Sequence, residues 1–264
     1  MGSSEKQVLI REDGKRMDGR ELNALRPIKI EAGVLNKADG SAYIEWGENK
    51  ILAAVYGPKE CIPKHETDPY RAVLHCRYMM APFSSIEEHG RSGPSRRSTE
   101  LSKVIREVFE NVVLTEQFPK TAIDIFIEVL QADGGTRCAG ITAAAVALAN
   151  AGIPMRDLVC AVAVGKIEGK IALDFSRDED NYGESDIPVA FAPRNGDILL
   201  FQLDGLLNRD EMRQALEMAR EGSKHVHGLQ VEALRKVYES KKDEGGNSNG
   251  ANNAGAGAAG SGVG

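Results

Sequence analysis

Two adjacent arginines stand where the sequence predicts the start of a helix. In GPSRRSTEL (residues 93–101) a Gly-Pro break is followed by serines that can act as N-caps, and apolar residues then recur at helical spacing. We expect an amphipathic helix over about residues 98–114. A helix N-terminus carries partial positive charge and favours Asp or Glu, not Arg. Arg96 and Arg97 therefore either lie in solvent beside the acidic residues 87–88, or bind an anion together with the helix N-terminus.

A second candidate anion site is the segment DGGTR. Gly134 and Gly135 follow a predicted strand and precede a predicted helix, so a ligand can approach the backbone closely. Free N–H groups at the helix start, the Thr136 hydroxyl and the Arg137 guanidinium are all donors that suit an oxyanion. The segment matches neither GxGxxG nor the Walker pattern. A tight strand-to-helix turn without a ligand is the alternative interpretation.

Carboxylates gather in the acidic segment between residues 174 and 186. Asp186 opens an apolar stretch that predicts a strand, and Asp180 precedes it by six residues, ahead of a glycine-containing turn. Asp180 can fold back beside Asp186 in the loop expected over residues 177–186. Two such carboxylates suit a divalent cation or a general acid, although most acidic segments are solvated loops.

Together these three segments indicate phosphoryl transfer. Two arginine-bearing sites for phosphate and a pair of carboxylates supply the positioning and the charge neutralisation on which that chemistry depends.

The elements that must position these residues predict an α+β fold rather than a doubly wound parallel sheet. Strands and helices alternate irregularly along the chain, in two units that meet near residue 153. Strands are expected over 28–56 with a hairpin at 48–50, and over 71–83, 121–130, 157–169, 170–176, 186–193 and 197–205; further helices are expected over 138–152 and 209–240. Residues 1–17 form a charged lead-in, 18–152 and 153–240 the two domains, and 241–264 a disordered tail rich in Gly, Ala and Asn.

Composition narrows the protein's class without identifying a ligand. The 264 residues carry a net charge of −6, so nucleic-acid binding would need a local basic channel. No apolar run approaches the roughly 18 residues that span a bilayer, and the polar N-terminus predicts no signal peptide, so we expect a cytoplasmic protein without membrane contact. The four scattered cysteines are expected to be reduced and mostly buried: Cys61, Cys76, Cys138 and Cys160.

Five segments resemble the RNase PH family, and within it the catalytic RNase PH-like branch of the archaeal exosome. They are RMDGRELNALRPIKIEAGVL, SAYIEWGENKILAAVYGP, AIDIFIEVLQADGGTR, AGIPMRDLV and LDFSRDEDNYGESDIPVA, which occur in the family's order together with the GPSRR segment over about residues 15–240. The resemblance implies two βαβ-type halves with mixed sheets and packed helices. It also implies a 3′→5′ exoribonuclease in which inorganic phosphate, the co-substrate, releases nucleoside diphosphates; the reverse reaction adds RNA tails.

The resemblance also implies roles for individual residues. Arg96 and Arg97 match RNA-binding arginines, and Asp180 matches the general acid. Asp186 matches a second carboxylate that either binds a divalent cation with Asp180, expected to be Mg²⁺, or positions Asp180. The loop Gly134, Gly135, Thr136 and Arg137 matches the phosphate-binding loop. Lys64 and His65 match a basic RNA channel, although residues 61–65 are less basic here than is usual for the family.

The expected partners are an inactive RNase PH-like paralogue, RNA-binding cap subunits and single-stranded RNA 3′ ends. The paralogue would form a hexameric ring of three heterodimers with this chain. One alternative is a bacterial-type RNase PH that trims tRNA 3′ ends, but there a Gln-Gly-Thr sequence replaces the FQLDG at residues 201–205. The other is a catalytically inactive ring subunit that only binds RNA, which should lack the arginine pair or the carboxylates.

Overall fold

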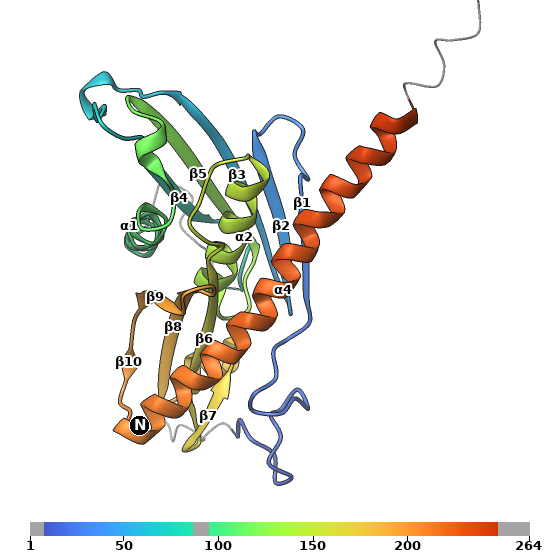
Figure 1. Ribbon diagram of the computed structural model, residues 1–264. Coiled ribbons are helices and arrows are strands. Elements are labelled where there is room, and N and C mark those ends of the chain that lie inside the picture. Colours follow the sequence, from blue (N-terminus) through green and yellow to red (C-terminus); the bar gives the residue numbers. More distant parts are fainter. Residues whose placement is uncertain (1–7, 87–94, 248–264) are drawn as a thin grey trace, which may run out of the picture.

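Two five-stranded sheets and four helices make up the computed structural model, which describes residues 8–86 and 95–247 (Figure 1). The α+β class predicted from the sequence is confirmed. The longest helix, α4 (Arg209–Asn247), runs diagonally across both sheets and packs on β1 of one and on β6, β7 and β8 of the other. Buried side chains from both sheets and from the helices between them form one continuous core.

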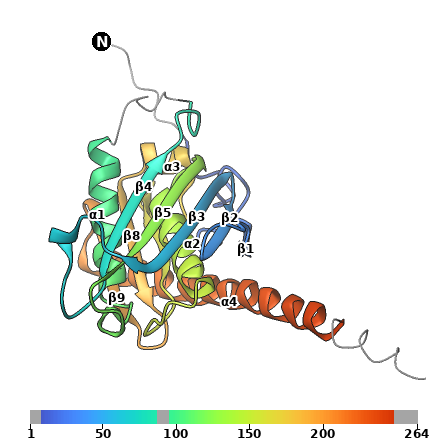
Figure 2. The same ribbon diagram turned by 90° about the horizontal axis from the view of Figure 1, so that it is seen from above.

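The first sheet has the strand order β1-β2-β3-β5-β4, which Figure 2 shows from above. Its hairpins pair antiparallel, whereas β4 lies parallel to β5 and reaches it through α1 (Arg96–Glu110), because parallel neighbours need a crossover connection. Alternate residues of β5 point into the core, as the alternation of apolar and polar residues predicted. The strands are β1 (Ile28–Ala32), β2 (Gly40–Trp46), β3 (Asn49–Glu60), β4 (Val73–Met80) and β5 (Thr121–Gln131).

The second sheet has the order β10-β8-β6-β7, with β9 also paired to β8, and all its described pairs are antiparallel. The expectation of mixed sheets therefore holds for the first sheet alone. β7 and β8 are joined by α3 (Arg177–Tyr182), so both run antiparallel to the β6 strand that separates them. The strands are β6 (Cys160–Ile167), β7 (Lys170–Leu173), β8 (Ser185–Ala192), β9 (Asp197–Phe201) and β10 (Asp204–Gly205).

The helix α2 (Thr136–Asn150) lies between the sheets and contacts strands of both. Its sequence is dominated by alanine, and nearly every residue from Thr136 to Leu148 is buried. Small side chains let a helix approach two sheets at once, and burial on all sides explains why it lacks an amphipathic pattern. The N-terminus of α2 is thereby fixed where the two sheets meet.

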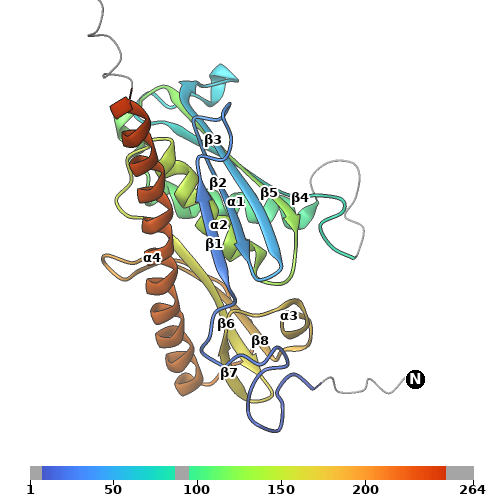
Figure 3. The same cartoon turned by 90° about the vertical axis from the view of Figure 1, so that its right-hand side faces the viewer.

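The chain ends differ from the sequence-based expectation. Residues 8–17, expected as part of a charged lead-in, pack beside the second sheet near α3 (Figure 3), with Leu9, Ile10 and Arg16 buried. At the other end α4 continues to Asn247, so residues 241–247 of the expected tail are helical, and 248–264 lie outside the described residues. All four cysteines are free thiols, three of them buried. No helix within 8–86 and 95–247 is long and apolar enough to cross a membrane.

Candidate active site

A polar pocket of about 570 Å³ lies where the starts of α1 and α2 meet α3, β8 and the β9–β10 connection. Arg97, Arg137, Asp180 and Asp186 all line it, so the structure brings together the three segments that the sequence singled out. A small cavity beside it is lined by the same four residues together with Gly135 and Thr136. The remaining residues of the larger pocket are Glu100, Asn181, Gly183, Glu184, Ser185, Pro188, Gln202, Leu203, Asp204 and Gly205.

Only one residue of the arginine pair at the start of α1 lines the pocket. Ser95 is the N-cap of α1 and its hydroxyl accepts a hydrogen bond from the Ser98 N–H at 3.1 Å, so the helix begins at Arg96, two residues earlier than expected. Both arginines are exposed, but Arg97 lines the pocket and Arg96 does not. Residues 87–88, the alternative partners for these arginines, lie outside the described residues.

The DGGTR segment places its donors at the N-terminus of α2. Gly135 is the N-cap in a left-handed conformation, with φ of 67°, and the first turn contains no acidic residue to occupy the free N–H groups. The Thr136 hydroxyl accepts a hydrogen bond from Tyr78 at 2.9 Å. Arg137 donates to Gln202 Oε1 at 2.5 Å, which holds the guanidinium at the pocket wall. This arrangement suits an oxyanion on the α2 N-terminus.

Gly134 allows close packing of the loop and does not line the cavities, unlike Gly135, Thr136 and Arg137. It lines neither cavity, and a Cβ at this position would lie 2.7 Å from the backbone carbon of Ser176. Its φ of 70° also favours glycine. Only glycine therefore allows this loop to contact the connection between β7 and α3. Asp180 lies on α3, so this contact sets how close the loop comes to that helix.

The acidic segment is a helix where a loop was expected. Residues 177–182 form α3, because Ser176 and Glu179 make a capping box and Arg16 binds the Glu179 carboxylate, with Nε at 2.6 Å from Oε1. Asp180 lies on this helix and Asp186 on β8. The two carboxylates nevertheless reach the same pocket, as the sequence predicted.

Both carboxyl groups are harder to ionise than an ordinary Asp. Burial, reinforced by the nearby charge of Asp180, raises the pKa of Asp186 to about 6. Asp180 reaches solvent at the pocket rim, but the surrounding protein still removes part of its hydration and raises its pKa, while Arg97 and Arg137 oppose that rise. Asp204, which pairs with Asp186 across β10 and β8, raises the pKa of both groups. A raised pKa brings a carboxyl group closer to the range in which it can act as a general acid.

The charge of the pocket favours a cation as well as anions. Five carboxylates face two arginines in its lining, which are Glu100, Asp180, Glu184, Asp186 and Asp204 against Arg97 and Arg137. No group of three or more His, Cys, Asp or Glu side chains is arranged to hold a metal in the part of the chain that the structure describes. The Asp180–Asp186 pair still fits Mg²⁺, which usually takes one or two carboxylates and completes its shell with water and substrate phosphates.

Lys64 and His65 are not brought to this pocket. They lie in a short 3-10 turn, Lys64–Glu66, on the connection between β3 and β4, with side chains 86% and 80% exposed. Lys64 forms an ion pair with Glu60 at 3.4 Å. Their predicted contact with RNA is possible only along a path outside the pocket.

The buried residues that bind the DGGTR segment on the side away from the pocket were not predicted from the sequence. Arg26 is buried and binds the Asp174 carboxylate through Nη2 at 2.7 Å and through its own backbone N–H at 2.6 Å. It also binds Asp133 and Gly134 of the DGGTR segment. The only available signal was an arginine between Leu25 and Pro27 at the start of an apolar strand, which is not specific.

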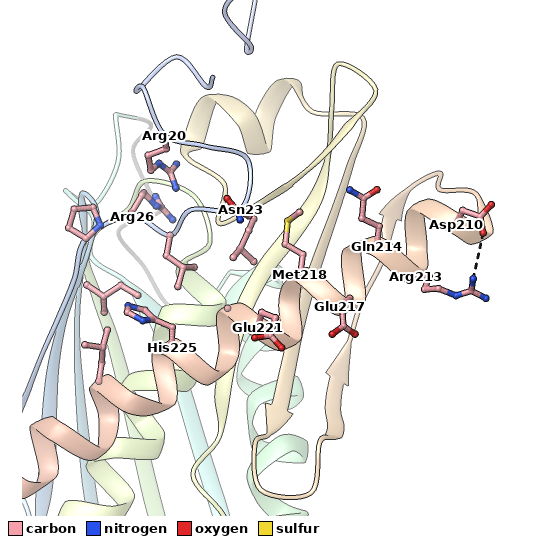
Figure 4. Close-up of a pocket in the computed structure, with 16 residues that line it drawn as sticks. Arg20, Asn23, Arg26, Asp210, Arg213, Gln214, Glu217, Met218, Glu221 and His225 are labelled. Atoms are coloured by element: carbon pink, nitrogen blue, oxygen red, sulfur yellow. Dashed lines mark ion pairs between the residues drawn. The ribbon is translucent and has the colours of Figure 1, made fainter. Parts of the chain in front are cut away.

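A larger cavity than this pocket lies elsewhere. It is a groove of about 1230 Å³ between α4 and residues 20–28, shown in Figure 4. Its walls are largely apolar, and Arg26 at its edge is already paired with Asp174. The smaller pocket instead combines convergent donors with carboxylates of raised pKa, so we assign the chemistry to it.

Comparisons with known proteins identify the family of this chain. Profiles of the 3′ exoribonuclease family match residues 24–154 as domain 1 and 157–222 as domain 2. The chain is 61% identical to the exosome complex component Rrp41 of Thermococcus onnurineus, covering 90% of this chain and 95% of the relative. It is 56% identical to the Rrp41 component of Thermoplasma acidophilum, covering 87% and 92%.

Solved structures share the fold. Rice Rrp46 superposes with a TM-score of 0.75 at 25% identity, covering 83% of this chain and all of that chain. A chain of the Archaeoglobus fulgidus exosome with RNA bound to the active site gives a TM-score of 0.71 at 24% identity, covering 81% and 92%. The two family profiles together span well over half of the sequence. This chain belongs to the RNase PH family of 3′ exoribonucleases.

Proposed function

We propose that this chain is the catalytic subunit of an archaeal-type exosome and degrades RNA from its 3′ end by phosphorolysis. The observation that carries the proposal is the meeting of Arg137 on the α2 N-terminus with Asp180 and Asp186 in one pocket. An anion-binding helix start beside a carboxyl group of raised pKa supplies what phosphate attack on a phosphodiester needs.

In the proposed reaction an oxygen of inorganic phosphate attacks the phosphorus of the last phosphodiester. A new P–O bond forms as the bond from phosphorus to the preceding O3′ breaks, which releases a nucleoside diphosphate. The loop residues Gly135, Thr136 and Arg137 hold the attacking phosphate. Asp180 gives its proton to the departing O3′, and the same steps in reverse add nucleotides from diphosphates. Because phosphate is the nucleophile, the reaction is not a hydrolysis.

A divalent cation, which we expect to be Mg²⁺, would be held by Asp180 and Asp186 and would neutralise phosphate charge. A bound cation fits the excess of carboxylates over arginines in the pocket, because without it these carboxylates would repel the two phosphate groups of the reaction. Asp186 must be ionised for this role, whereas Asp180 must deliver a proton. The pKa of Asp186 is raised to about 6 and that of Asp180 is raised as well, so this division requires the bound cation to lower the pKa of Asp186.

Arg97, which lines the pocket, would bind the RNA backbone next to the scissile bond, and Arg96 would bind a phosphate further out. Lys64 and His65 would contact RNA only before it enters the pocket. Contacts of this kind act on phosphates, so binding should depend on salt and only slightly on sequence.

For partners we propose single-stranded RNA 3′ ends, an inactive RNase PH-like paralogue in a ring of three heterodimers, and RNA-binding cap subunits. The similarity to chains named as exosome components supports assembly into such a complex. The complete set of Arg97, Arg137, Asp180 and Asp186 around one pocket opposes the alternative of an inactive scaffold. A cytoplasmic location stays a prediction.

The test is to incubate end-labelled RNA with the assembled ring, with and without inorganic phosphate, and to separate the products by thin-layer chromatography. We expect nucleoside diphosphates only when phosphate is present. Monophosphates in its absence, or no product at all, would overturn the proposal.

A further inference from the structure

Asn49, the first residue of β3, is fully buried and bonds the DGGTR loop from behind. Its side-chain Nδ2 donates to the Gly134 carbonyl at 2.6 Å, and its Oδ1 accepts from the Asp133 N–H at 2.6 Å. One amide therefore binds two successive residues of a segment more than eighty positions away. It lines neither of the cavities at the active site.

Arg26 reinforces the same arrangement. Its Nη2 lies 3.3 Å from the Gly134 carbonyl, and its Nη1 binds the Asp133 carbonyl. The guanidinium is itself held by the Asp174 carboxylate at 2.7–3.2 Å. Two successive carbonyl groups of the loop are thus directed toward Asn49 and Arg26.

The orientation of the Gly134 carbonyl fixes the orientation of the Gly135 N–H, because both belong to the same peptide group. A trans peptide is planar, and its N–H points opposite to its C=O. With the Gly134 carbonyl held toward Asn49 and Arg26, the N–H of Gly135 must point away from them. Gly135 lines the small cavity with Arg97, Arg137, Asp180 and Asp186, whereas Asn49 and Arg26 do not. The hydrogen bonds from Asn49 and Arg26 to the Gly134 carbonyl therefore set the direction of the Gly135 N–H on the opposite side of the peptide.

We propose that Asn49 is a positioning residue for inorganic phosphate: it fixes the Gly134–Gly135 peptide so that the Gly135 N–H is aimed at the bound anion. The inference rests on the proposed function, which supplies phosphate as the co-substrate. Asn49 is a better probe than Arg26, because loss of Arg26 removes the closer ionic partner of the buried Asp174 carboxylate, leaves it only Arg20 at 3.4 Å, and so destabilises the chain as a whole.

The test variant is Asn49→Asp, which keeps the size and the acceptor for Asp133 but replaces the donor that faces the Gly134 carbonyl. A matched control is Gln230→Glu. Gln230 is also fully buried and donates to two backbone carbonyls, those of Thr142 and Val159, away from the pocket. Both variants lose an amide donor in the interior, but only one of them faces the phosphate loop.

With the assembled ring and saturating RNA, we expect Asn49→Asp to raise the KM for inorganic phosphate about ten- to hundredfold, as for loss of one hydrogen bond to a charged group. The RNA dissociation constant should change less than about twofold. Gln230→Glu should lower Tm without raising that KM. A phosphate KM for Asn49→Asp within about twofold of wild type, or an equal rise in Gln230→Glu, would overturn the inference.

A second measurement keeps the two proposals distinguishable. The rise in Tm caused by inorganic phosphate reports its binding without any turnover. It should be lost in Asn49→Asp, and in Asn49→Ser if the first variant does not fold, yet persist in Gln230→Glu. A wild-type ring that is stabilised by phosphate but releases no diphosphate would reject the proposed function alone. Stabilisation that persists in the Asn49 variants would reject the positioning role alone.

Discussion

Replacing the Asp180 carboxyl group by an amide separates proton transfer from binding. Asp180→Asn keeps the shape of the side chain on α3 but removes the acidic proton. General acids contribute about 10²–10⁴-fold to rate, or about 2.7–5.4 kcal/mol. We expect a rate loss near the middle of this range, about 10³-fold, for the acid that protonates the leaving O3′. RNA affinity should change less than about twofold, because the amide matches the protonated carboxyl group in charge and in shape.

The assay compares two RNA substrates that differ in one atom of the terminal linkage. When sulfur replaces the bridging 3′ oxygen, the leaving group departs as a thiolate and needs little help from an acid. We expect Asp180→Asn to lose about 10³-fold on the oxygen substrate and less than about tenfold on the sulfur substrate. Asp178→Asn, on the same helix but exposed and outside the pocket, is the matched control and should be within about twofold of wild type. Equal losses on both substrates would refute the role of Asp180 as the general acid.

Three further predictions concern charge. Arg97→Glu should weaken RNA binding at least about tenfold and more than Arg96→Glu, measured by fluorescence anisotropy at fixed salt, since only Arg97 lines the pocket; equal effects would contradict the division of the pair. Asp204→Asn should lower the pKa of the two site carboxyl groups and move the acidic limb of the pH–rate profile down by several tenths of a unit, whereas an upward shift would contradict it. Arg16→Ala should cost about 3–5 kcal/mol, or roughly 6–20 °C in Tm, because it removes the bidentate partner of the buried Glu179 carboxylate and leaves Arg20, at 3.9 Å, as its ionic partner. Burial alone would raise the pKa of Glu179, but Arg16 holds it below its usual value, so this stabilisation is complete above about pH 4.3 and is lost as the pH falls through the folded-state pKa; an acid-unfolding curve unchanged by Arg16→Ala would refute it.

Local patterns predicted the strands and helices well because burial imposes their periodicity. The alternation along β5 and the helical spacing after residue 100 are both consequences of one face meeting the core. The start of α1 was misplaced by two residues, because any of several serines could cap it. The segment around Asp180 was taken for a loop, since α3 depends on a buried arginine from the distant N-terminal segment, Arg16.

The residues that line the pocket were easier to predict than the buried residues that position them. Arg97, Arg137, Asp180 and Asp186 are polar residues at element boundaries, where a binding role is a natural interpretation. Asn49, Arg26 and Asp174 act through contacts between residues more than eighty positions apart, and nothing in their local sequence distinguishes them. The assignment of Lys64 and His65 to RNA came from the resemblance alone; the structure places them outside the pocket, and their contact with RNA stays a prediction.

The most direct test of phosphorolysis follows an isotope from the nucleophile into the product. RNA is degraded by the assembled ring in the presence of ¹⁸O-labelled inorganic phosphate, and in a parallel reaction in ¹⁸O-labelled water, and the released nucleotides are weighed by mass spectrometry. We predict nucleoside diphosphates that carry label from phosphate and none from water. Nucleoside monophosphates labelled from water would show that water is the nucleophile and would contradict the central claim.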